Sequence, residues 1–433
     1  MTHITIRNIG PVREASIDLN RVNVFMGPQS SGKSTIAKII SYCTWYEKNF
    51  ILKSNLSKEN FLRELITFHN LENDYFDDSS CIEYVSDCFH LVYEYNEVTK
   101  AEPKNDCVFK NRKVEYIPAE RNLVSLPGFA KYNDTRDNIL NFLYDWYQAK
   151  QSYTEGDKYE LPIPAMNTSY FYDKNSDTDY IHIDNGRKIG LRHASSGLMS
   201  VTPLIVVFDY ILKGIYSRKN PLSPSGAINF KDALQDAIDK AVKEGKNTDQ
   251  LVRLMGMLVQ IKNDYESQPR TGESFTQFLS SDEQLDKIVQ PILNLMGFHP
   301  DYVFSNIIIE EPELNLFPNT QRDLVYYMLE SVCNPEREHV LTLTTHSPYI
   351  LFALNNCMMG GLVHDKIDDS VKENLCSAHS WIDPKMVSIY EIHSGELVRI
   401  QDEDGIIDDN YLNKAYKEIT SEYLSLLEFY DEE

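Results

Sequence analysis

Short apolar runs and longer helical stripes alternate along the chain. The apolar run 22–26 precedes a glycine-rich turn, and a helical stripe follows at 36–40. Runs rich in β-branched residues at 306–309 and 340–344 are typical of strands buried on both faces. Strands that alternate with helices in this way predict an α/β fold whose core sheet is largely parallel, or mixed with some antiparallel strands.

Shorter patterns predict the remaining elements. Further strands are expected at 4–6, 15–19, 114–117, 180–183, 188–191, 387–392 and 397–400. Helices are expected at about 135–150 and at the end of the chain, where one face carries Leu412, Tyr416, Ile419, Tyr423 and Leu427. The stretch from about 55 to 90 is also interpreted as helical and acidic, with Leu62, Leu65, Ile66 and His69 on one helical face.

The stretch 216–300 has a different pattern of apolar and polar residues, which predicts a helical insertion. Three helices are expected there, at about 231–244, 249–265 and 281–297. The expected organisation is a first part of the core at 1–215 that contains a helical insertion at about 45–110, the helical insertion 216–300, and a second part of the core at 301–433 that ends in a helix and an acidic tail.

Composition places the chain among folded proteins. It has 433 residues, of which 42% are hydrophobic and 25% charged. No apolar stretch approaches the roughly 20 residues that span a bilayer, and the first residues lack the pattern of a signal peptide. The 7 cysteines are odd in number and form no C-x-x-C pair, which argues against a disulfide framework or a zinc site and favours a reducing cytoplasm.

The chain is strongly acidic. Its net charge is −23, from 42 basic and 65 acidic residues, so we expect weak or absent DNA binding and no membrane partner. Acidic residues are densest near the end, at 402–404, 408–409 and 431–433. We interpret these runs as a solvated tail rather than a docking surface.

One segment carries the strongest chemical signal. It fits G-x-x-x-x-G-K-[ST] and comprises Gly27, Pro28, Gln29, Ser30, Ser31, Gly32, Lys33, Ser34 and Thr35. Its glycines let backbone N–H groups surround phosphates, Lys33 reaches the β and γ phosphates, and the Ser34 hydroxyl can hold Mg²⁺. Because an expected strand and helix flank the segment, it predicts a phosphate loop that binds ATP with Mg²⁺.

An acidic cluster follows the buried strand 307–309. The strand runs directly into Glu310, Glu311, Pro312 and Glu313. A carboxylate at the end of a strand can fix Mg²⁺ through water, and the next one can polarise the attacking water. We assign Glu310 to the metal and Glu311 to the water; the plain alternative is an acidic loop after a strand.

Two weaker motifs complete the set. His346 lies just past the strand 340–344, where a histidine can sense the γ-phosphate, although a lone histidine is more often structural. Ser195, Ser196 and Gly197 begin an expected helix, where hydroxyls and open amides can meet phosphate, although such residues usually only cap a helix.

In this order the motifs resemble the ABC-class ATPases, in particular the soluble Rad50/SMC/RecF and OLD-like branch. The resemblance covers about half the chain and implies an ABC-type P-loop core that works as a homo-oligomer, at least a dimer, with composite ATP sites. It further implies that Ser195–Gly197 is the signature that caps ATP in a partner subunit, and that Glu313–Leu316 couples the two sites. The stretch 116–121 lies where the family has its glutamine loop, but it contains no glutamine.

The chain departs from the general pattern of that class. Glu310 stands where the class has an aspartate, the signature lacks its second glycine and trailing glutamine, and about 110 residues separate the signature from the acidic strand. These features resemble the ATPase subunits of bacterial antiphage systems of the PARIS and Septu types and OLD-family enzymes. By this analogy the chain is a cytoplasmic ATPase, converting ATP and water to ADP and phosphate, that controls a separate effector such as a Toprim-type nuclease.

Three other functions fit the sequence less well. A DNA-repair or chromosome-associated ATPase would need a basic DNA path and, in its long forms, heptads over hundreds of residues, for which the interval 38–195 is too short. A transporter ATPase is disfavoured by the large insertion. A self-contained nuclease is disfavoured because only about 85 residues follow His346, and their D-x-D at 402–404 is better explained as a solvated loop.

Overall fold

The computed structural model describes most of the chain. The described residues are 2–53, 56–105, 107–125, 137–183, 186–217, 302–333, 336–427 and 429–430. The three helices expected between 231 and 297, and the acidic residues 431–433, lie outside these ranges. The division of the chain into two core parts and a helical insertion therefore stays a prediction.

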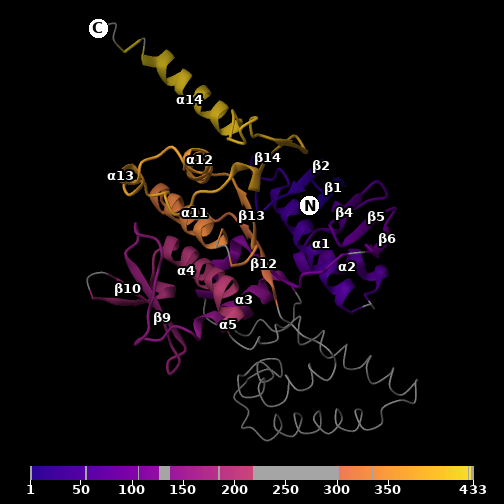
Figure 1. Ribbon diagram of the computed structural model, residues 1–433, viewed down its shortest axis with the longest axis horizontal. Helices are drawn as coiled ribbons and strands as arrows, with labels where there is room; N and C mark the ends of the chain where they lie inside the picture. The colour runs from indigo at the N-terminus through magenta and orange to yellow at the C-terminus, as the bar shows by residue number, and fades with distance from the viewer. Residues whose placement is uncertain are drawn as a thin grey trace, which may run out of the picture.

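A large mixed sheet forms the centre of the molecule (Figure 1). Within the described ranges its strand order is β6-β5-β4-β1-β2-β15-β14-β3-β13-β12-β7. Neighbouring strands run parallel in one half, which comprises β14 (Val387–His393), β3 (Val22–Met26), β13 (Val340–Thr345), β12 (Phe304–Glu310) and β7 (Arg112–Ile117). The predicted α/β class with a mixed sheet is confirmed.

The other half of the sheet is mostly antiparallel. It consists of β1 (Thr2–Ile9), β2 (Val12–Leu19), β4 (Cys81–Val85), β5 (Phe89–Glu94), β6 (Glu97–Pro103) and β15 (Glu396–Arg399). Buried and half-exposed residues alternate strictly along β4 and β5, so one face of each strand packs on the core and the other meets solvent. We call β4, β5 and β6 the antiparallel arm.

The arm corrects the sequence interpretation of the stretch from 55 to 90 and of a helical insertion at about 45–110. Only α2 (Phe61–His69) follows the helical stripe, and the chain then forms strands. The period-two signal is visible in Ile82 and Tyr84, and again in Phe89 and Leu91, whose side chains are fully buried. The helical interpretation was wrong because it extended the period of α2 past its end at Asn70, a left-handed C-cap with φ of 49°.

Helices cover both faces of the parallel half, as Figure 1 shows. On one face α1 (Lys33–Lys53) packs on Phe25 and Ile308. On the other face, Val24 and Ile309 pack against the helices α3 (Asn138–Lys150), α4 (Ser196–Asp209), α11 (Pro318–Val332) and α12 (Pro348–Val363). Successive residues of one strand thus enter different cores, which explains why these strands are apolar throughout.

The remaining elements are small. A second sheet has the order β11-β10-β9-β8 and contains β8 (Tyr159–Glu160), β9 (Thr168–Asp173), β10 (Thr178–Ile183) and β11 (Lys188–Gly190). Short helices are η1 (Lys58–Asn60), η2 (Asn73–Tyr75), η3 (Ala119–Ser125), η5 (Leu191–His193), the π-helix η6 (Tyr210–Gly214), α5 (Ile215–Ser217), α13 (Asp369–Lys372) and η8 (Pro384–Met386). The last helix, α14 (Tyr411–Leu427), extends away from the body (Figure 1). All the expected strands and the closing helix are confirmed.

One helical stretch is longer and more apolar than the sequence analysis expected. Ser196–Gly214 has 19 residues, enough by length and composition to cross a membrane. However, 78% of its apolar window is buried inside the protein. It therefore has the surroundings of a core helix, packed between α3 and the strands of the parallel half.

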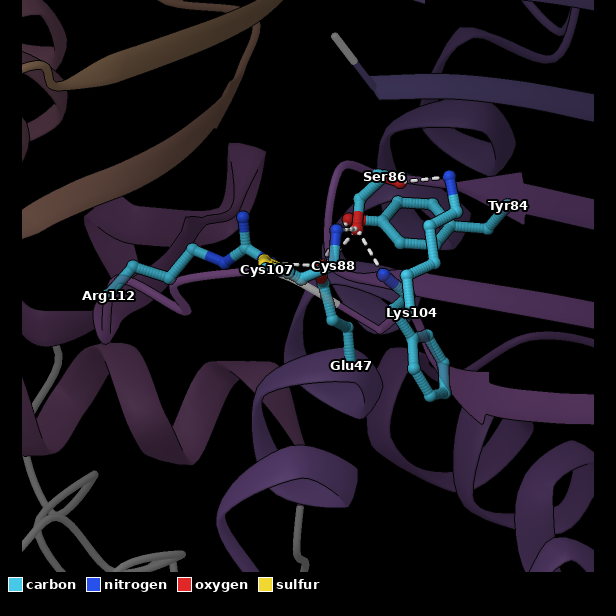
Figure 2. The surroundings of a disulfide bond; sticks show 8 residues. Glu47, Tyr84, Ser86, Cys88, Lys104, Cys107 and Arg112 are labelled. Carbon is cyan, nitrogen blue, oxygen red and sulfur yellow. Dashed lines mark hydrogen bonds and ion pairs between the residues drawn. A yellow bond between two sulfur atoms is a disulfide. The ribbon is translucent and has the colours of Figure 1, made fainter.

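A disulfide joins Cys88, at the start of β5, to Cys107, in the segment after β6 (Figure 2). The carboxylate of Glu47 on α1 lies beside it and accepts hydrogen bonds from Tyr84, Ser86 and Arg112. This disulfide departs from the expectation that the cysteines form no such framework. The pattern of cysteines gave no sign of it, because the pair is brought together only when the chain returns along β6.

Candidate functional site

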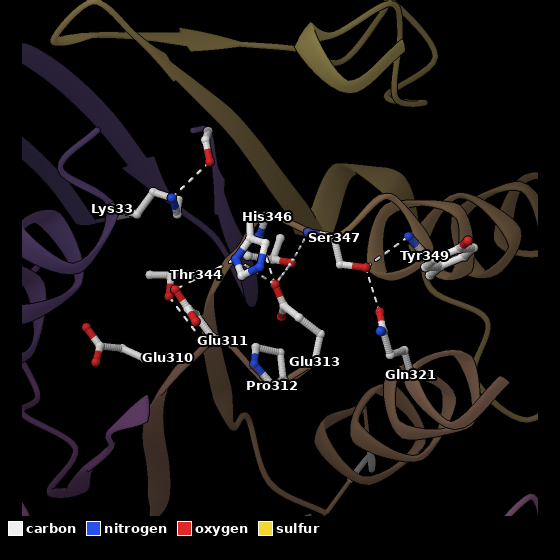
Figure 3. A network of polar contacts seen from close by, with 12 residues as sticks. Lys33, Glu310, Glu311, Pro312, Glu313, Gln321, Thr344, His346, Ser347 and Tyr349 are labelled. Carbon is white, nitrogen blue, oxygen red and sulfur yellow. Dashed lines mark hydrogen bonds and ion pairs between the residues drawn. The ribbon is translucent and has the colours of Figure 1, made fainter. Parts of the chain in front are cut away.

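The predicted motifs meet where three parallel strands end. In the register of the sheet, Thr345 of β13 pairs with Met26 of β3, and Thr344 pairs with Glu310 of β12. The phosphate loop, the acidic cluster and the histidine each follow one of these strands directly. Because carboxyl ends of parallel strands share one edge, the sequence brings these groups to one place in the fold (Figure 3).

The phosphate loop has the backbone geometry its glycines predict. Gly27 and Gly32 adopt φ of 154° and 107°, and a Cβ at Gly27 would lie 2.8 Å from the carbonyl oxygen of Ile392. Ser30 also has a positive φ, of 59°. The helix α1 begins at Lys33, so its first amides face the loop, and the side chain of Ser34 is exposed.

Lys33 lies across its own loop. Its ammonium donates to the carbonyl oxygens of Gly27, at 2.9 Å, and Pro28, at 2.7 Å. Burial lowers the pKa of Lys33, while the carboxylates of Glu311 and Glu313 act in the opposite direction. The lysine is thus a buried cation with two carboxylates near enough to affect its charge, which is the setting of a phosphate ligand.

Glu310 and Glu311 differ in their surroundings. Glu310 is buried, with 5% of its surface exposed; its Oε2 accepts from the amide of Ala119 at 3.4 Å, and its Oε1 has no hydrogen-bond partner. Glu311 is half-buried, and its backbone is held at φ of 41° by a hydrogen bond from its amide to the carbonyl oxygen of Thr344, at 3.0 Å. A buried acceptor without a partner fits a hydrated cation, and a more open carboxylate fits contact with water.

No group of three or more His, Cys, Asp or Glu side chains in the described ranges is arranged to hold a metal by itself. A cation here would therefore share the Ser34 hydroxyl, Glu310, water and the nucleotide's own phosphates. Mg²⁺ is bound in this way in phosphate-transfer sites, since it keeps several waters and takes few protein ligands.

Glu313 fixes the position of His346. Its Oε1 accepts from the hydroxyl of Thr345, at 2.7 Å, and from the amide of His346, at 2.8 Å. The imidazole Nδ1 lies 3.4 Å from this carboxylate and 3.7 Å from Oε1 of Glu311 (Figure 3). His346 is therefore placed between the carboxylate assigned to water and the loop that follows it.

The proposed signature lies beside that same loop. Ser195 caps α4, with its hydroxyl accepting from the amide of Leu198 at 3.3 Å. Asn315 donates to the hydroxyl of Ser200 at 3.2 Å, and a Cβ at Gly197 would lie 2.9 Å from the carbonyl oxygen of Asn315. The hydrogen bonds and ion pairs of the described residues connect Ser195–Ser200 to the loop after β12 but not to the phosphate loop of the same chain.

Arg121 connects the signature helix to the acidic strand end, and the sequence analysis assigned it no role. Its guanidinium is buried, with 1% exposed, and donates to the carbonyl oxygens of Glu310 at 2.8 Å, Glu311 at 2.7 Å and Ser200 at 3.1 Å. Burial lowers the pKa of Arg121 to about 10, while the carboxylates of Glu313, Glu310 and Glu311 oppose this, so it remains a cation at neutral pH. The available signal was an arginine three residues after Pro118, which itself directly follows β7.

Comparisons with known proteins give a family for the chain. A family model described as an AAA domain, AAA_23, matches residues 3–296. None of the curated proteins matches the chain. Among solved structures, the chain is similar to the SMC head domain from Thermotoga maritima, with 9% identity, a TM-score of 0.36, and coverage of 93% of this chain and 98% of that one. It is also similar to the recombination mediator protein RecF, with 10% identity, a TM-score of 0.31, and coverage of 92% and 97%.

Proposed function

Because the chain belongs to the AAA_23 family of AAA domains, we propose that it is a P-loop ATPase that dimerises on ATP and uses hydrolysis to control a partner effector. The observation that carries the proposal is the meeting of Lys33, the carboxylates of Glu310 and Glu311, and His346 at one edge of the sheet. Phosphoryl transfer depends mostly on positioning and charge, and these residue types supply both.

Each residue has a separate task in the proposed reaction. Lys33 and the amides of the phosphate loop hold the β and γ phosphates, and Ser34 and Glu310 would hold Mg²⁺, which would neutralise charge on these phosphates. Glu311 accepts a proton from the attacking water as its oxygen bonds to the γ phosphorus, and the bond to the ADP oxygen breaks. His346 contacts the γ-phosphate and reports its presence to Glu313 and the loop that follows.

The ATP sites are composite in this proposal. Ser195–Gly197 lies against the loop of Glu313–Leu316 rather than against the phosphate loop of the same chain, which supports its use on a nucleotide held by a second copy. Closure of the two copies would then change the positions of the catalytic carboxylates, because Asn315 and Arg121 connect the signature helix to them.

Light scattering on the Glu311→Gln variant tests this arrangement, with Ile419→Asp added so that the exposed helix α14 cannot join two copies by itself. With ATP and Mg²⁺ it should accumulate as a dimer, since binding is kept and hydrolysis is slowed. Adding Ser196→Arg should lower the mass to the value measured without ATP. The affinity of a single copy for nucleotide should not change. A Glu311→Gln, Ile419→Asp protein that binds ATP but has the same mass with and without it would contradict the composite site.

The biological setting is also part of the proposal: a cytoplasmic switch in antiphage defence with a separate effector, for which a Toprim-type nuclease is the leading candidate. It is supported by the motif pattern alone. Cells that carry the gene with its neighbours should reduce phage plating, and Lys33→Ala should remove the effect. A neighbouring nuclease should co-purify with the ATPase, whereas nanomolar binding of duplex DNA at physiological salt would instead support a repair role.

A further inference from the structure

The helix α14 is the longest of the described elements that have no buried residue. None of its residues is buried, and it extends beyond the body (Figure 1). Its exposed apolar residues include Tyr416 at 71%, Ile419 at 70%, Tyr423 at 62% and Leu426 at 64%. An isolated helix of 17 residues is marginal in water, so a helix with these side chains requires a covering surface.

Five apolar residues of α14 follow one seam, and Leu424 lies outside it. Leu412, Tyr416, Ile419, Tyr423 and Leu426 are spaced by four, three, four and three residues, which is the a/d spacing of helices that pack along their length. The opposite face is polar and includes Lys414, Lys417, Glu418, Ser421 and Ser425. Such a separation of apolar and polar faces indicates that the helix packs against another helix and is not surrounded by water on all sides.

The charge pattern allows a second copy of the same chain as the occupant. The whole chain carries −23, but between Tyr411 and Leu427 two lysines are matched by two glutamates, Glu418 and Glu422. A copy of this face therefore meets its counterpart without local repulsion, although the two proteins are strongly acidic. The seam itself contains no charged residue.

The area also suits self-association. The two tyrosines of the seam, with Ile419 and Leu426, are exposed by 62–71% and offer on the order of 600 Å² on each helix. A standard interface buries about 800 Å² per partner, so a pair of these helices alone supplies most of the area that a specific dimer needs.

The base of α14 is fixed next to the phosphate-loop strand. Asn410 caps the helix, accepting from the amide of Leu412 at 3.1 Å, and the amide of Tyr411 donates to Glu391 of β14 at 3.1 Å. Glu391 pairs in register with Met26, the residue before Gly27. A partner held by α14 is therefore held by the part of the sheet that carries the ATP site.

We propose that α14 pairs with α14 of a second copy through the seam centred on Ile419, and that this pairing needs no nucleotide. The pair keeps two ATPase bodies together between cycles, which raises their effective concentration for closure. This tethering role rests on the proposed ATP-driven dimer; the pairing itself does not.

Mass measurement in the absence of nucleotide tests the pairing, and Lys33→Ala serves as background so that ATP closure plays no part. This protein should be a dimer, and adding Ile419→Asp should make it a monomer. Ser421→Asp is the matched control on the polar face and should leave the dimer intact. These substitutions leave the core unchanged, since α14 has no buried residue.

Cross-linking then identifies the surface. Ile419 is the middle residue of α14, so Ile419→Cys meets its counterpart in either orientation of the helices. In a Cys376→Ser background, which removes the exposed native thiol, Ile419→Cys should form a covalent dimer under mild oxidation and Ser421→Cys should not. A monomer without nucleotide, or a dimer that survives Ile419→Asp, overturns the proposal. Loss of the ATP-dependent dimer alone would overturn only the proposed function.

Discussion

The parallel half and the antiparallel half of the large sheet use their polar residues for different purposes. In the parallel half, strands end in groups that can act on phosphate, such as Lys33 after β3 and Glu310 at the end of β12. Beside the antiparallel arm, the polar residues instead bond to one another: Glu47 of α1 accepts from Tyr84 and Ser86 in a buried cluster (Figure 2). Beside the arm, both oxygens of the buried carboxylate of Glu47 have hydrogen-bond partners. At the parallel edge, the buried carboxylate of Glu310 keeps one oxygen without a partner, which leaves it available to a ligand.

Lys33→Ala should give the largest effect on hydrolysis. It removes the buried ammonium that faces the phosphates, and steady-state ATP turnover should fall by roughly 1,000-fold. Lys38→Ala is the matched control, since it removes the same charge from the same helix α1 outside the loop. If the Lys33→Ala protein hydrolyses ATP at the parental rate, hydrolysis does not take place at the edge of the parallel half.

Glu311→Gln should slow hydrolysis by about 100-fold and keep ATP binding, because it removes the acceptor for the proton of the attacking water. Glu310→Gln should instead weaken the Mg²⁺ dependence of nucleotide binding. Single-turnover rates and nucleotide affinities at several Mg²⁺ concentrations separate the two. If Glu310→Gln gives the slow, tight-binding behaviour, the two carboxylates have the opposite roles.

Arg121→Met should slow single-turnover hydrolysis by about 10- to 100-fold without a matching loss of ATP affinity, because misplaced catalytic groups lower the rate more than the binding. Loss of a donor also leaves buried carbonyls unpaired, which should cost about 1–3 kcal/mol of stability. Arg121→Lys keeps the charge without the planar fork and serves as the conservative variant. Equal losses of rate and affinity would indicate a purely structural role for Arg121.

Cys88→Ser should affect stability and leave hydrolysis unchanged, since the arm carries no catalytic group in our proposal. The Cys88–Cys107 bond spans 19 residues, so its removal should lower the free energy of unfolding by about 3 kcal/mol in urea titrations. Cys376→Ser, which changes an exposed free thiol, is the control. Alkylation of intact cells followed by mass mapping would show whether this bond persists in the cytoplasm that we propose.

The parallel half was predictable because its signals are local. A strand buried on both faces is apolar throughout, as in β3 and β12, and a motif directly after it needs no long-range contact to be recognised. The arm was harder to predict because α2 masks the change of period before β4. The pairing of Cys88 with Cys107 and the contacts of Arg121 could not be predicted, since both depend on segments far apart in the sequence.

The close approach of Gly197 to Asn315 also has a consequence for sequence variation among related chains. No side chain fits at 197, where a Cβ would lie 2.9 Å from a carbonyl oxygen, and Asn315 adopts a φ of 61°, which asparagine and glycine tolerate best. We therefore expect natural variants to keep glycine at 197 and to exchange position 315 only between these two residues. The residue types at neighbouring positions on the exposed turns should vary more than those at 197 and 315.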